Sequence, residues 1–497
     1  MKIHKMILTV CVVGVLPMVG VAAAREKPDV LFIAVDDMND WTTLFDKDNP
    51  IQTPNLVRLA ERGCFFSRAY CTTPCCNPSR TAVMIGQRPT TSGVYGNRQD
   101  WRKYLPDVVS LPQYFKQNGY RANGAGKIFH RGNTVGEGND TAFHEYYKPK
   151  KSDISRFKSK TAGTGPWTPS RKERGNLNGY TKAENKHLAG AAFDWGELNV
   201  EIQQDEYTVG YVGDVLENFP KDKPLFLGAG IHRPHLPFYA PPETFKRYPF
   251  ESVVLPPMPE GDLDDVPAIG KVMAASQDFV FKHTSNKPDD DAGSLKKMVQ
   301  CYQAASDYAD EMVGRILDKL DETGRADNTI IVLWSDHGYH LGDKSSCVKF
   351  SLWEKSDHVP FVIVAPGVAT PGTRCDKPVS LVDIYPTLVE LAGLPAKSDI
   401  DGTSVVPLLK NPTQKWNPAI TTMGPGNHAI RSDRWRYIRY KDGTEELYDH
   451  ENDSWELNNV AAAYPEVIEE HKKWLPEKEA PMPEKYLNAW IYGPWDR

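Results

Sequence analysis

The sequence predicts an α/β fold: a large domain with a mostly parallel mixed sheet between helices, and a smaller C-terminal α+β subdomain with an antiparallel sheet. Three unbroken apolar runs, at 29–35, 224–230 and 329–334, are typical of strands buried on both faces of a parallel sheet. After residue 410 the pattern changes to alternating polar and apolar residues around the hairpin signal Asp442-Gly443. We therefore expect a large domain over 25–410 and a subdomain over 411–497.

The composition is that of a globular protein. Of the 497 residues, 40% are hydrophobic and 25% are charged, which argues against a mostly disordered chain. The net charge is −6 and no basic run stands out, so nucleic acid is not an expected partner.

The first 24 residues have the pattern of a signal peptide. A short basic start is followed by the apolar run 6–21 and by the small residues 22–24, which suit a cleavage site. A membrane anchor is the weaker alternative, because the apolar run is short and contains Pro17. We expect a secreted or periplasmic protein with no stable membrane insertion after cleavage.

The remaining elements follow from periodicity and end signals. Apolar residues between Met298 and Leu320 recur at helical spacing and predict the clearest helix. The segment 131–201 is polar and weakly periodic, so we expect long loops there, which in a compact domain are often functional. Further helices are predicted over 53–63, 79–85, 111–118, 381–393 and 465–474, and further strands over 120–130, 359–365, 429–440 and 446–448.

Acidic residues follow two of the buried apolar runs. Asp36 and Asp37 end the first run, and Asp336 and His337 follow the third. Sheets of this class bind ligands at the carboxyl ends of their strands. Two adjacent carboxylates repel each other unless a cation holds them, which favours a metal site; a solvated turn is the alternative.

Basic and imidazole side chains occupy comparable positions. Lys127 and His130 fall near the end of the strand-like segment 120–130, and His232 is presented where Pro234 stops another strand. Taken alone, a residue such as Lys127 or His130 is more often on the surface than catalytic. The alternative for His232 is a structural histidine in a turn, with its hydrogen bonds made.

Cys76 lies just before the predicted start of a helix at Ser79. The free N–H groups and partial positive charge of a helix start favour an anionic nucleophile and an anionic substrate, and Arg80 adds a permanent cation. An ordinary helix start with a buried cysteine is the alternative. Seven cysteines follow the predicted leader, so at least one is unpaired or modified, and the other six could form disulfides of unknown connectivity.

Together these segments resemble the type I sulfatases, and most closely the iduronate-2-sulfatase-like branch. The family signature is C-x-P-S-R followed by Gly and Arg, which matches residues 76–80, Gly86 and Arg88. In the family's order, further matches are F-I-A-V-D-D, L-P-Q-Y-F-K-Q-N-G-Y, G-K-I-F-H, G-I-H-R-P-H-L-P-F and S-D-H-G-Y-H-L-G, with Lys349 ahead of D-H-V-P-F-V. The resemblance covers nearly all of the mature chain and implies an alkaline-phosphatase-like large domain.

The resemblance also implies the chemistry of the site. Cys76 would be oxidised to formylglycine (3-oxoalanine) by a formylglycine-generating or anaerobic sulfatase-maturing enzyme, and the aldehyde hydrate would be the nucleophile. Asp36, Asp37, Asp336, His337 and the modified Cys76 would bind one divalent cation, calcium rather than magnesium. Arg80 and Lys127 would hold the formylglycine, Lys127 and Lys349 the sulfate oxygens, His130 the formylglycine hydroxyl and His232 the ester-bridge oxygen.

The expected substrate is a sulfated oligosaccharide or polysaccharide with its sulfate on a uronic acid or a similar sugar. Trp101 and Arg102 are candidates for a wall of the pocket, and the insert 131–186, with Trp167 and Tyr180, for a sugar-binding surface. Two alternatives remain open. One is a phosphate or phosphonate ester hydrolase on the same scaffold, and the other is a non-catalytic secreted glycan-binding protein whose Cys76 stays unmodified.

Overall fold

The computed structural model describes residues 27–130, 142–149, 177–178, 194–199, 204–275 and 278–482. The predicted signal peptide and most of the predicted loop segment 131–201, including Trp167 and Tyr180, lie outside these residues.

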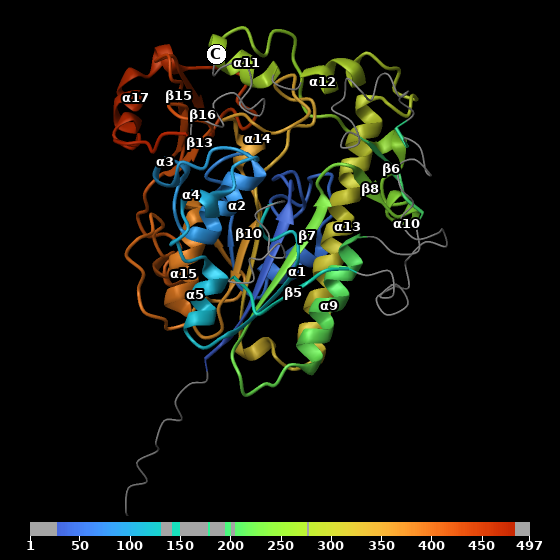
Figure 1. The fold of residues 1–497 in the computed structure, drawn as a ribbon. Helices are drawn as coiled ribbons and strands as arrows, with labels where there is room; N and C mark the ends of the chain where they lie inside the picture. Colours follow the sequence, from blue (N-terminus) through green and yellow to red (C-terminus); the bar gives the residue numbers. More distant parts are fainter. Residues whose placement is uncertain are drawn as a thin grey trace, which may run out of the picture.

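An eight-stranded sheet forms the centre of the molecule, in the order β11-β2-β10-β9-β1-β7-β4-β5 (Figure 1). Only β10 runs against its neighbours, so the predicted mostly parallel mixed sheet is confirmed. The strands are β1 (Asp29–Asp36), β2 (Cys64–Phe66), β4 (Arg121–Gly126), β5 (Glu145–Tyr147), β7 (Leu225–Pro234), β9 (Thr329–Ser335), β10 (Phe361–Val364) and β11 (Thr373–Cys375).

Helices cover both faces of this sheet, and the alternation of side chains along β1 explains why. Leu31, Ile33 and Val35 join the core cluster beneath α1 (Pro54–Ala60), α9 (Gln204–Asn218) and α13 (Leu295–Glu322). Val30, Phe32 and Ala34 join the opposite cluster, beneath α2 (Cys76–Ile85), α5 (Leu111–Gln117) and α15 (Ile384–Leu391). Both faces of β1 are therefore buried, as its continuous apolar run indicates (Figure 1).

Shorter elements complete the large domain. They are β3 (Ala69–Tyr70), α3 (Pro89–Ser92), α4 (Trp101–Tyr104), β6 (Trp195–Glu197), β8 (Phe238–Ala240), α10 (Pro242–Phe245), α11 (Ala268–Ala274), α12 (Asp278–Ser285), α14 (Glu354–Asp357), β12 (Val379–Ser380) and α16 (Val406–Lys410).

A four-stranded antiparallel sheet, β13-β14-β15-β16, forms the C-terminal part. Its strands are β13 (Ala419–Thr422), β14 (His428–Arg431), β15 (Trp435–Arg439) and β16 (Glu445–Asp449), followed by α17 (Pro465–Lys472). The predicted single strand over 429–440 was wrong. The chain reverses between β14 and β15, where Ser432 and Trp435 exchange hydrogen bonds without a glycine or proline that would have signalled a turn.

A buried ionic network joins this sheet to the large domain. The guanidinium group of Arg436 on β15 pairs with both oxygens of Asp357, at 2.8 and 2.9 Å, and with Glu456 at 2.7 Å. It also pairs with Glu354, and it donates to the carbonyl oxygen of Leu352 at 2.9 Å. Glu354 and Asp357 lie on α14, so Arg436, together with Arg431 on β14, which pairs with Glu354 at 3.2 Å, holds the C-terminal sheet against the segment that follows Lys349.

Two further expectations are corrected. The helix that carries the cysteine motif begins at Cys76 and not at Ser79, because Cys75 is extended and acts as the N-cap. All seven cysteines among the described residues are unpaired, including the six for which disulfides were considered.

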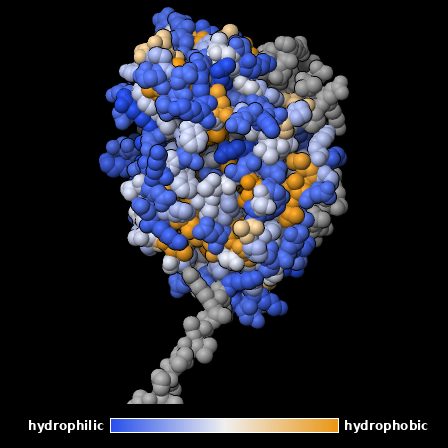
Figure 2. All heavy atoms as spheres, turned by 90° about the vertical axis from the view of Figure 1, so that its left-hand side faces the viewer, coloured by the Kyte–Doolittle hydropathy of each residue, from blue (hydrophilic) through white to orange (hydrophobic). Residues whose placement is uncertain are grey.

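The surface of the described residues is mainly polar on the face that carries α5 and α15, with smaller hydrophobic areas between (Figure 2). No helix within the described ranges has the length and the apolar character that crossing a bilayer requires.

Candidate active site

Cys76 occupies the first turn of the buried helix α2 at the carboxyl edge of the central sheet. Ser79 donates a hydrogen bond to the carbonyl oxygen of Asp336, at 2.5 Å, which ties the helix start to the end of β9. Asn97 accepts a hydrogen bond from the backbone N–H of Asn77 at 2.9 Å. The Cys76 side chain is therefore fixed where a helix start favours negative charge.

The ends of β1 and β9 bring two carboxylates to this cysteine. Asp37 takes a left-handed conformation with φ of 66°, and its backbone N–H donates to Asp336 Oδ1 at 3.0 Å. Successive residues of a strand point to opposite faces, so this turn is what brings the carboxylate of Asp37 back toward Asp336. The left-handed region is sparsely populated by non-glycine residues and is frequent at functional sites.

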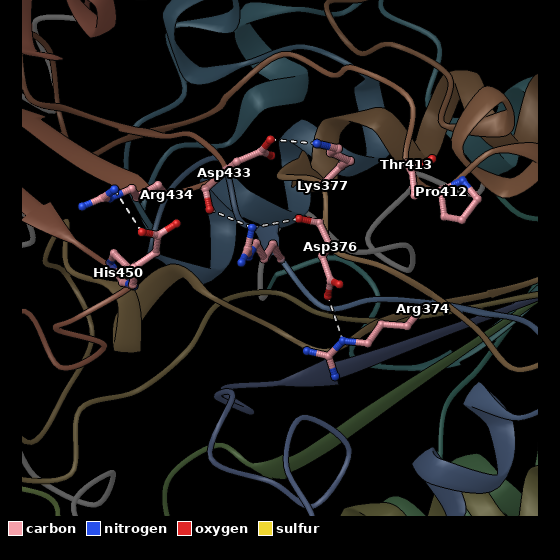
Figure 3. A pocket seen from close by; sticks show the side chains of 10 residues that line it. Arg374, Asp376, Lys377, Pro412, Thr413, Asp433, Arg434 and His450 are labelled. Atoms are coloured by element: carbon pink, nitrogen blue, oxygen red, sulfur yellow. Dashed lines mark hydrogen bonds and ion pairs between the residues drawn. The ribbon is translucent and has the colours of Figure 1, made fainter.

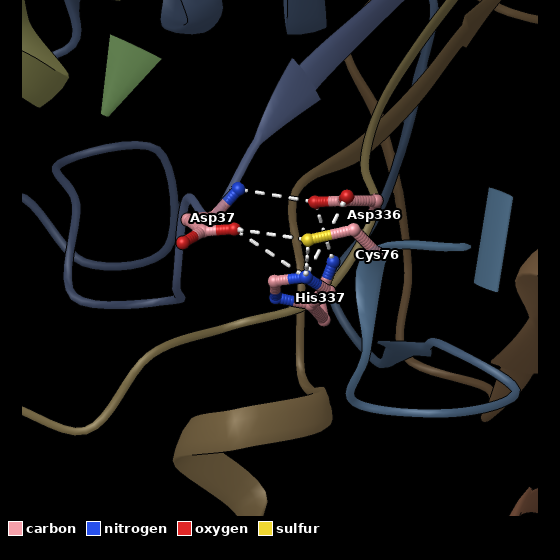
Figure 4. A group of neighbouring side chains, drawn as sticks. All are labelled: Asp37, Cys76, Asp336 and His337. Carbon is pink, nitrogen blue, oxygen red and sulfur yellow. Dashed lines mark hydrogen bonds and ion pairs between the residues drawn. The ribbon is translucent and has the colours of Figure 1, made fainter. Parts of the chain in front are cut away.

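Four side chains converge around one point: Asp37, Cys76, Asp336 and His337 (Figure 4). Their possible ligand atoms all lie within 4.8 Å of one another, and all four residues are buried. His337 Nδ1 donates to the carbonyl oxygen of Gly338 at 3.0 Å, which leaves Nε2 free to face the group. Such a second hydrogen bond is how proteins orient an imidazole toward a metal, so the residues fit a divalent cation.

Asp36 does not belong to this group. Its carboxylate contacts Arg80 at 3.0 Å, the ammonium group of Lys127, and His232 Nδ1 at 3.4 Å. Its predicted role as a metal ligand stays a prediction.

Three cations balance the three carboxylates of the site. Arg80 is buried and spans two of them, with Nε 2.7 Å from Asp336 and Nη2 3.0 Å from Asp36. Lys349 Nζ lies 2.8 and 2.7 Å from the two oxygens of Asp37 and 3.3 Å from Cys76 Sγ. Burial raises the pKa of the Cys76 thiol, but Lys127, Lys349 and His337 outweigh burial and hold that pKa well below its ordinary value.

Lys127 reaches the site because two strands approach closely at their ends. Its backbone N–H donates to the carbonyl oxygen of Gly230 at 3.0 Å. A Cβ atom on Gly126 would lie 1.9 Å from that same oxygen, and Gly126 has a φ of 76°. Glycine is therefore required at Gly126, and the approach aligns the end of β4 with the tip of β7.

His232 lies at that tip and stacks on His235, with 5.0 Å between the ring centroids. Burial lowers the pKa of His232 to about 3, against the contrary effect of its hydrogen bond to Asp36. The imidazole is therefore neutral at neutral pH before a substrate arrives.

His130 lies beside Cys76, and Arg102 lies against Trp101 and Phe129. Burial lowers the pKa of His130, and a hydrogen bond to Cys76 opposes this effect. The Arg102 guanidinium group lies 4.4 Å from the ring centre of Trp101 and 5.4 Å from that of Phe129. Two of its buried nitrogens, Nε and Nη2, have no hydrogen-bond partner among the described residues. Trp101 is only 1% exposed, so it supports Arg102 and offers no open ring face.

Two residues that sequence reasoning missed hold the site in place. The buried carboxylate of Asp205 on α9 accepts the backbone N–H groups of His232, at 2.7 Å, and Arg233, at 3.0 Å. The Tyr302 hydroxyl group donates to the carbonyl oxygen of Asp37 at 2.7 Å. Tyr302 fell in the apolar stripe of α13, and no periodic signal marked Asp205.

Comparisons with known proteins agree with this geometry. The Sulfatase family model matches residues 28–394, and a model described as N-sulphoglucosamine sulphohydrolase, C-terminal, matches residues 342–480. A sulfatase from Formosa agariphila is 38% identical over 473 residues, which cover 92% of this chain and 87% of the relative. Human iduronate 2-sulfatase is 28% identical over 405 residues, covering 75% and 70% of the two chains.

Solved structures share the fold. A protein solved in complex with its substrate D-glucosamine-2-N,6-O-disulfate superposes with a TM-score of 0.68 at 20% identity, covering 90% of this chain and 97% of the other. A phosphonate monoester hydrolase from Silicibacter pomeroyi also gives 0.68 at 20% identity, with 90% and 94% covered. The alkaline-phosphatase-like architecture is therefore common to both chemistries.

Proposed function

Because this chain belongs to the sulfatase family, we propose that it hydrolyses sulfate monoesters of a sulfated glycan, with Cys76 converted to formylglycine and one divalent cation bound beside it. The observation that carries this proposal is the convergence of three cations and a four-residue ligand group on Cys76 at a helix start.

The donor set favours a hard cation. Asp37 and Asp336 offer carboxylate oxygens and His337 offers Nε2, and an oxygen on the modified Cys76 would add to them. Mostly oxygen ligands suit calcium, with magnesium the less favoured choice. When bound, this cation would stabilise negative charge on the sulfate oxygens, and formylglycine would supply a hydrated aldehyde as the nucleophile.

The remaining residues act on the substrate and its protons. Lys127 and Lys349 bind the peripheral sulfate oxygens, and Arg80 keeps Asp36 and Asp336 in position. His232 donates a proton to the leaving alcohol, which requires that the negative charge of the bound ester raise the low pKa of this imidazole. His130 exchanges a proton at the position of Cys76 Sγ.

A sugar with a second acidic group suits the pocket. Nε and Nη2 of Arg102 are buried and lack a hydrogen-bond partner among the described residues, so a carboxylate or a further sulfate that reaches them would satisfy both. A uronic acid sulfate meets this requirement, and the names of the relatives point the same way: one is an iduronate 2-sulfatase and another was solved with a disulfated glucosamine. The predicted leader supports export to a compartment where such glycans occur, and a maturation enzyme is the expected partner for Cys76.

The experiment combines intact-protein mass with sulfate release. Conversion of Cys76 to formylglycine should change the mass of the chain, and the converted protein should release sulfate from heparan-type, dermatan-type or algal oligosaccharides. Cys76→Ala should fold and release none, whereas Cys76→Ser should at most become sulfated without turnover. Near-normal hydrolysis by either variant, or efficient turnover of choline sulfate with no release from any glycan, would defeat the proposal.

A phosphate or phosphonate ester hydrolase remains the second candidate, since a phosphonate monoester hydrolase shares this fold. Matched aryl sulfate, phosphate and phosphonate esters distinguish the two. A higher kcat/KM on the phosphonate than on the sulfate would favour the second candidate.

A further inference from the structure

Two adjacent pockets lie away from Cys76, where the large domain meets the C-terminal sheet. One, here called the arginine pocket, has a volume of about 360 Å³ and is lined by Arg68, Arg374, Lys377, Arg434 and His450, among others. The other, here called the tryptophan pocket, has about 380 Å³ and is lined by Arg88, Ser380, Lys415, Trp416 and Trp474, among others. Both volumes are in the range of small-ligand sites.

The two pockets are neighbours because consecutive residues line them. Lys377 and Thr413 line the arginine pocket, whereas Pro378 and Gln414 line the tryptophan pocket. Adjacent Cα atoms are about 3.8 Å apart, so the segments 377–378 and 413–414 form a shared wall. A ligand of several units can therefore occupy both pockets at once.

The two pockets, here together called the seam, are separate from the candidate active site but lie at the same edge of the sheet. Arg68 follows β2 and Asp376 follows β11, and both strands run parallel to β1. β2 is three strand spacings from β1, or roughly 14 Å. At the other pocket, Arg88 follows the C-terminal end of α2, whose first turn holds Cys76 and whose ten residues span roughly 15 Å.

Cations outnumber acids by one in the lining of the arginine pocket: Arg68, Arg374, Lys377 and Arg434 stand against Asp376, Asp433 and Glu451. Arg68 donates to the carbonyl oxygens of Asp376, at 3.1 Å, and Asp433, at 2.7 Å, and forms no ion pair with the described residues. Arg374 pairs with Asp376 and Lys377 pairs with Asp433, as Figure 3 shows. The Arg374 side chain is 53% exposed, and exposed ion pairs are worth only about 0–1 kcal/mol, so an incoming sulfate or carboxylate can exchange with them.

The tryptophan pocket offers a complementary surface for a sugar ring. Trp474 is one of the few large hydrophobic residues that the described chain exposes, at 37%, and Trp416 lines the same pocket. Lys415 is exposed and forms no ion pair with described residues. An exposed indole ring and a cation without an ion pair suit an acidic sugar better than a purely apolar ligand.

We propose that this seam is a second, non-catalytic binding site for an anionic polysaccharide, with an acidic group at Arg68 and Arg374 and a sugar ring at Trp416 and Trp474. The site holds a glycan chain outside the catalytic centre, and binding there does not depend on turnover at Cys76.

The test measures binding in the Cys76→Ala background, so that the ligand is not consumed. Immobilised heparin is the sulfated probe, hyaluronan the carboxylated probe and dextran the neutral one. Arg374→Glu and Trp474→Ala should each weaken heparin binding about tenfold, and Arg374→Glu should also reduce its salt dependence. Heparin should bind more tightly than hyaluronan, and dextran most weakly.

Matched controls exclude general effects of charge and surface area. Lys246→Glu reverses an exposed cation that caps α10 and pairs with Glu243, and Tyr464→Ala removes an aromatic side chain that is as exposed as Trp474. Both should bind heparin like the parent. Unchanged binding by Arg374→Glu and Trp474→Ala, equal losses in the controls, or equally sensitive binding of a single-stranded oligonucleotide would overturn the proposal.

Turnover separates this proposal from the catalytic one. With Cys76 restored, Arg374→Glu and Trp474→Ala should hydrolyse a small aryl sulfate within about twofold of the parent. Sulfate release together with unchanged heparin binding would refute the second site alone. Loss of heparin binding in a protein that never releases sulfate would refute only the catalytic proposal.

Discussion

Replacing Arg80 by lysine tests whether the fork of a guanidinium group, and not only its charge, organises the active site. Arg80 donates to the carboxylates of Asp36 and Asp336 and to three backbone carbonyl oxygens, those of Val35, Lys127 and Ile128. A lysine ammonium group acts from a single point and cannot reach all five acceptors.

The size of the effect follows from those contacts. At least two buried acceptors would lose their donor, at about 1–3 kcal/mol each, so Arg80→Lys should lower the free energy of unfolding by about 2–6 kcal/mol. Asp336 and the chain that carries Lys127 would also shift. A displacement of about 1 Å costs roughly 100-fold in rate, so kcat/KM on an aryl sulfate should fall by at least about that factor.

Arg325→Lys is the matched control. Arg325 is also buried, and it donates to Asp29, at 2.9 Å, and to the carbonyl oxygens of Leu216 and Phe219. It lies at the amino end of β1, about 23 Å from the carboxyl end that carries the site. Thermal unfolding should show losses of stability in both variants, but only Arg80→Lys should lose turnover beyond its loss of folded protein. Equal losses of kcat/KM in the two folded variants would refute the reasoning.

Three further predictions test the bound metal, the general acid and the dependence of stability on pH. Asp37→Ala should lose the bound cation and activity, as measured by elemental analysis and by calcium add-back after chelation. Asp40→Ala, which removes a partly buried carboxylate paired with Lys355, should keep the cation; full activity of metal-free protein would contradict this. His232→Ala should reduce kcat/KM on sugar sulfates by about 10²–10⁴ and much less on an activated aryl sulfate, which needs little protonation of its leaving group; equal losses would move the acid role to another residue. Burial raises the pKa of Asp310 to about 7, so the folded state binds a proton that the unfolded state has released, and stability should fall by up to about 4 kcal/mol from pH 4 to 7. Urea unfolding of Asp310→Asn should lack that part of the pH dependence, and an unchanged profile would show that Asp310 is not its source.

The sheet and the two strand ends that carry Asp37 and Asp336 were predictable because their signals are local. Continuous apolar runs place β1 and β9 in the middle of a parallel sheet, and parallel strands present their ends at one edge, so Asp37 and Asp336 meet. The separation of Asp36 from Asp37 was not anticipated, although adjacent strand residues point to opposite faces. This alternation explains why Asp36 and Asp37 contact different groups, and the role of Asp36 as a metal ligand stays a prediction.

Other features could not be predicted because they depend on contacts between distant segments. Asp205 acts on backbone N–H groups 27 and 28 residues away, and a buried acid in a first helical turn has no distinctive pattern. The burial of Trp101 depends on Phe129, which arrives from the end of another strand. Helix α2 begins at Cys76 because of the extended conformation of Cys75, which no residue type dictates.

The ionic network around Arg436 ties the C-terminal sheet to the large domain, so each part depends on the other for stability. A polypeptide shortened at residue 410 would keep α14 but lose β15, and the buried carboxylates of Glu354 and Asp357 would then lack the guanidinium group of Arg436. Removing one partner of a buried ion pair costs about 3–5 kcal/mol, a large share of the stability of an ordinary domain. A chimaera that exchanges the C-terminal sheet between relatives must therefore carry an arginine at the position of Arg436. Without it, the loop that positions Lys349 will be less firmly held.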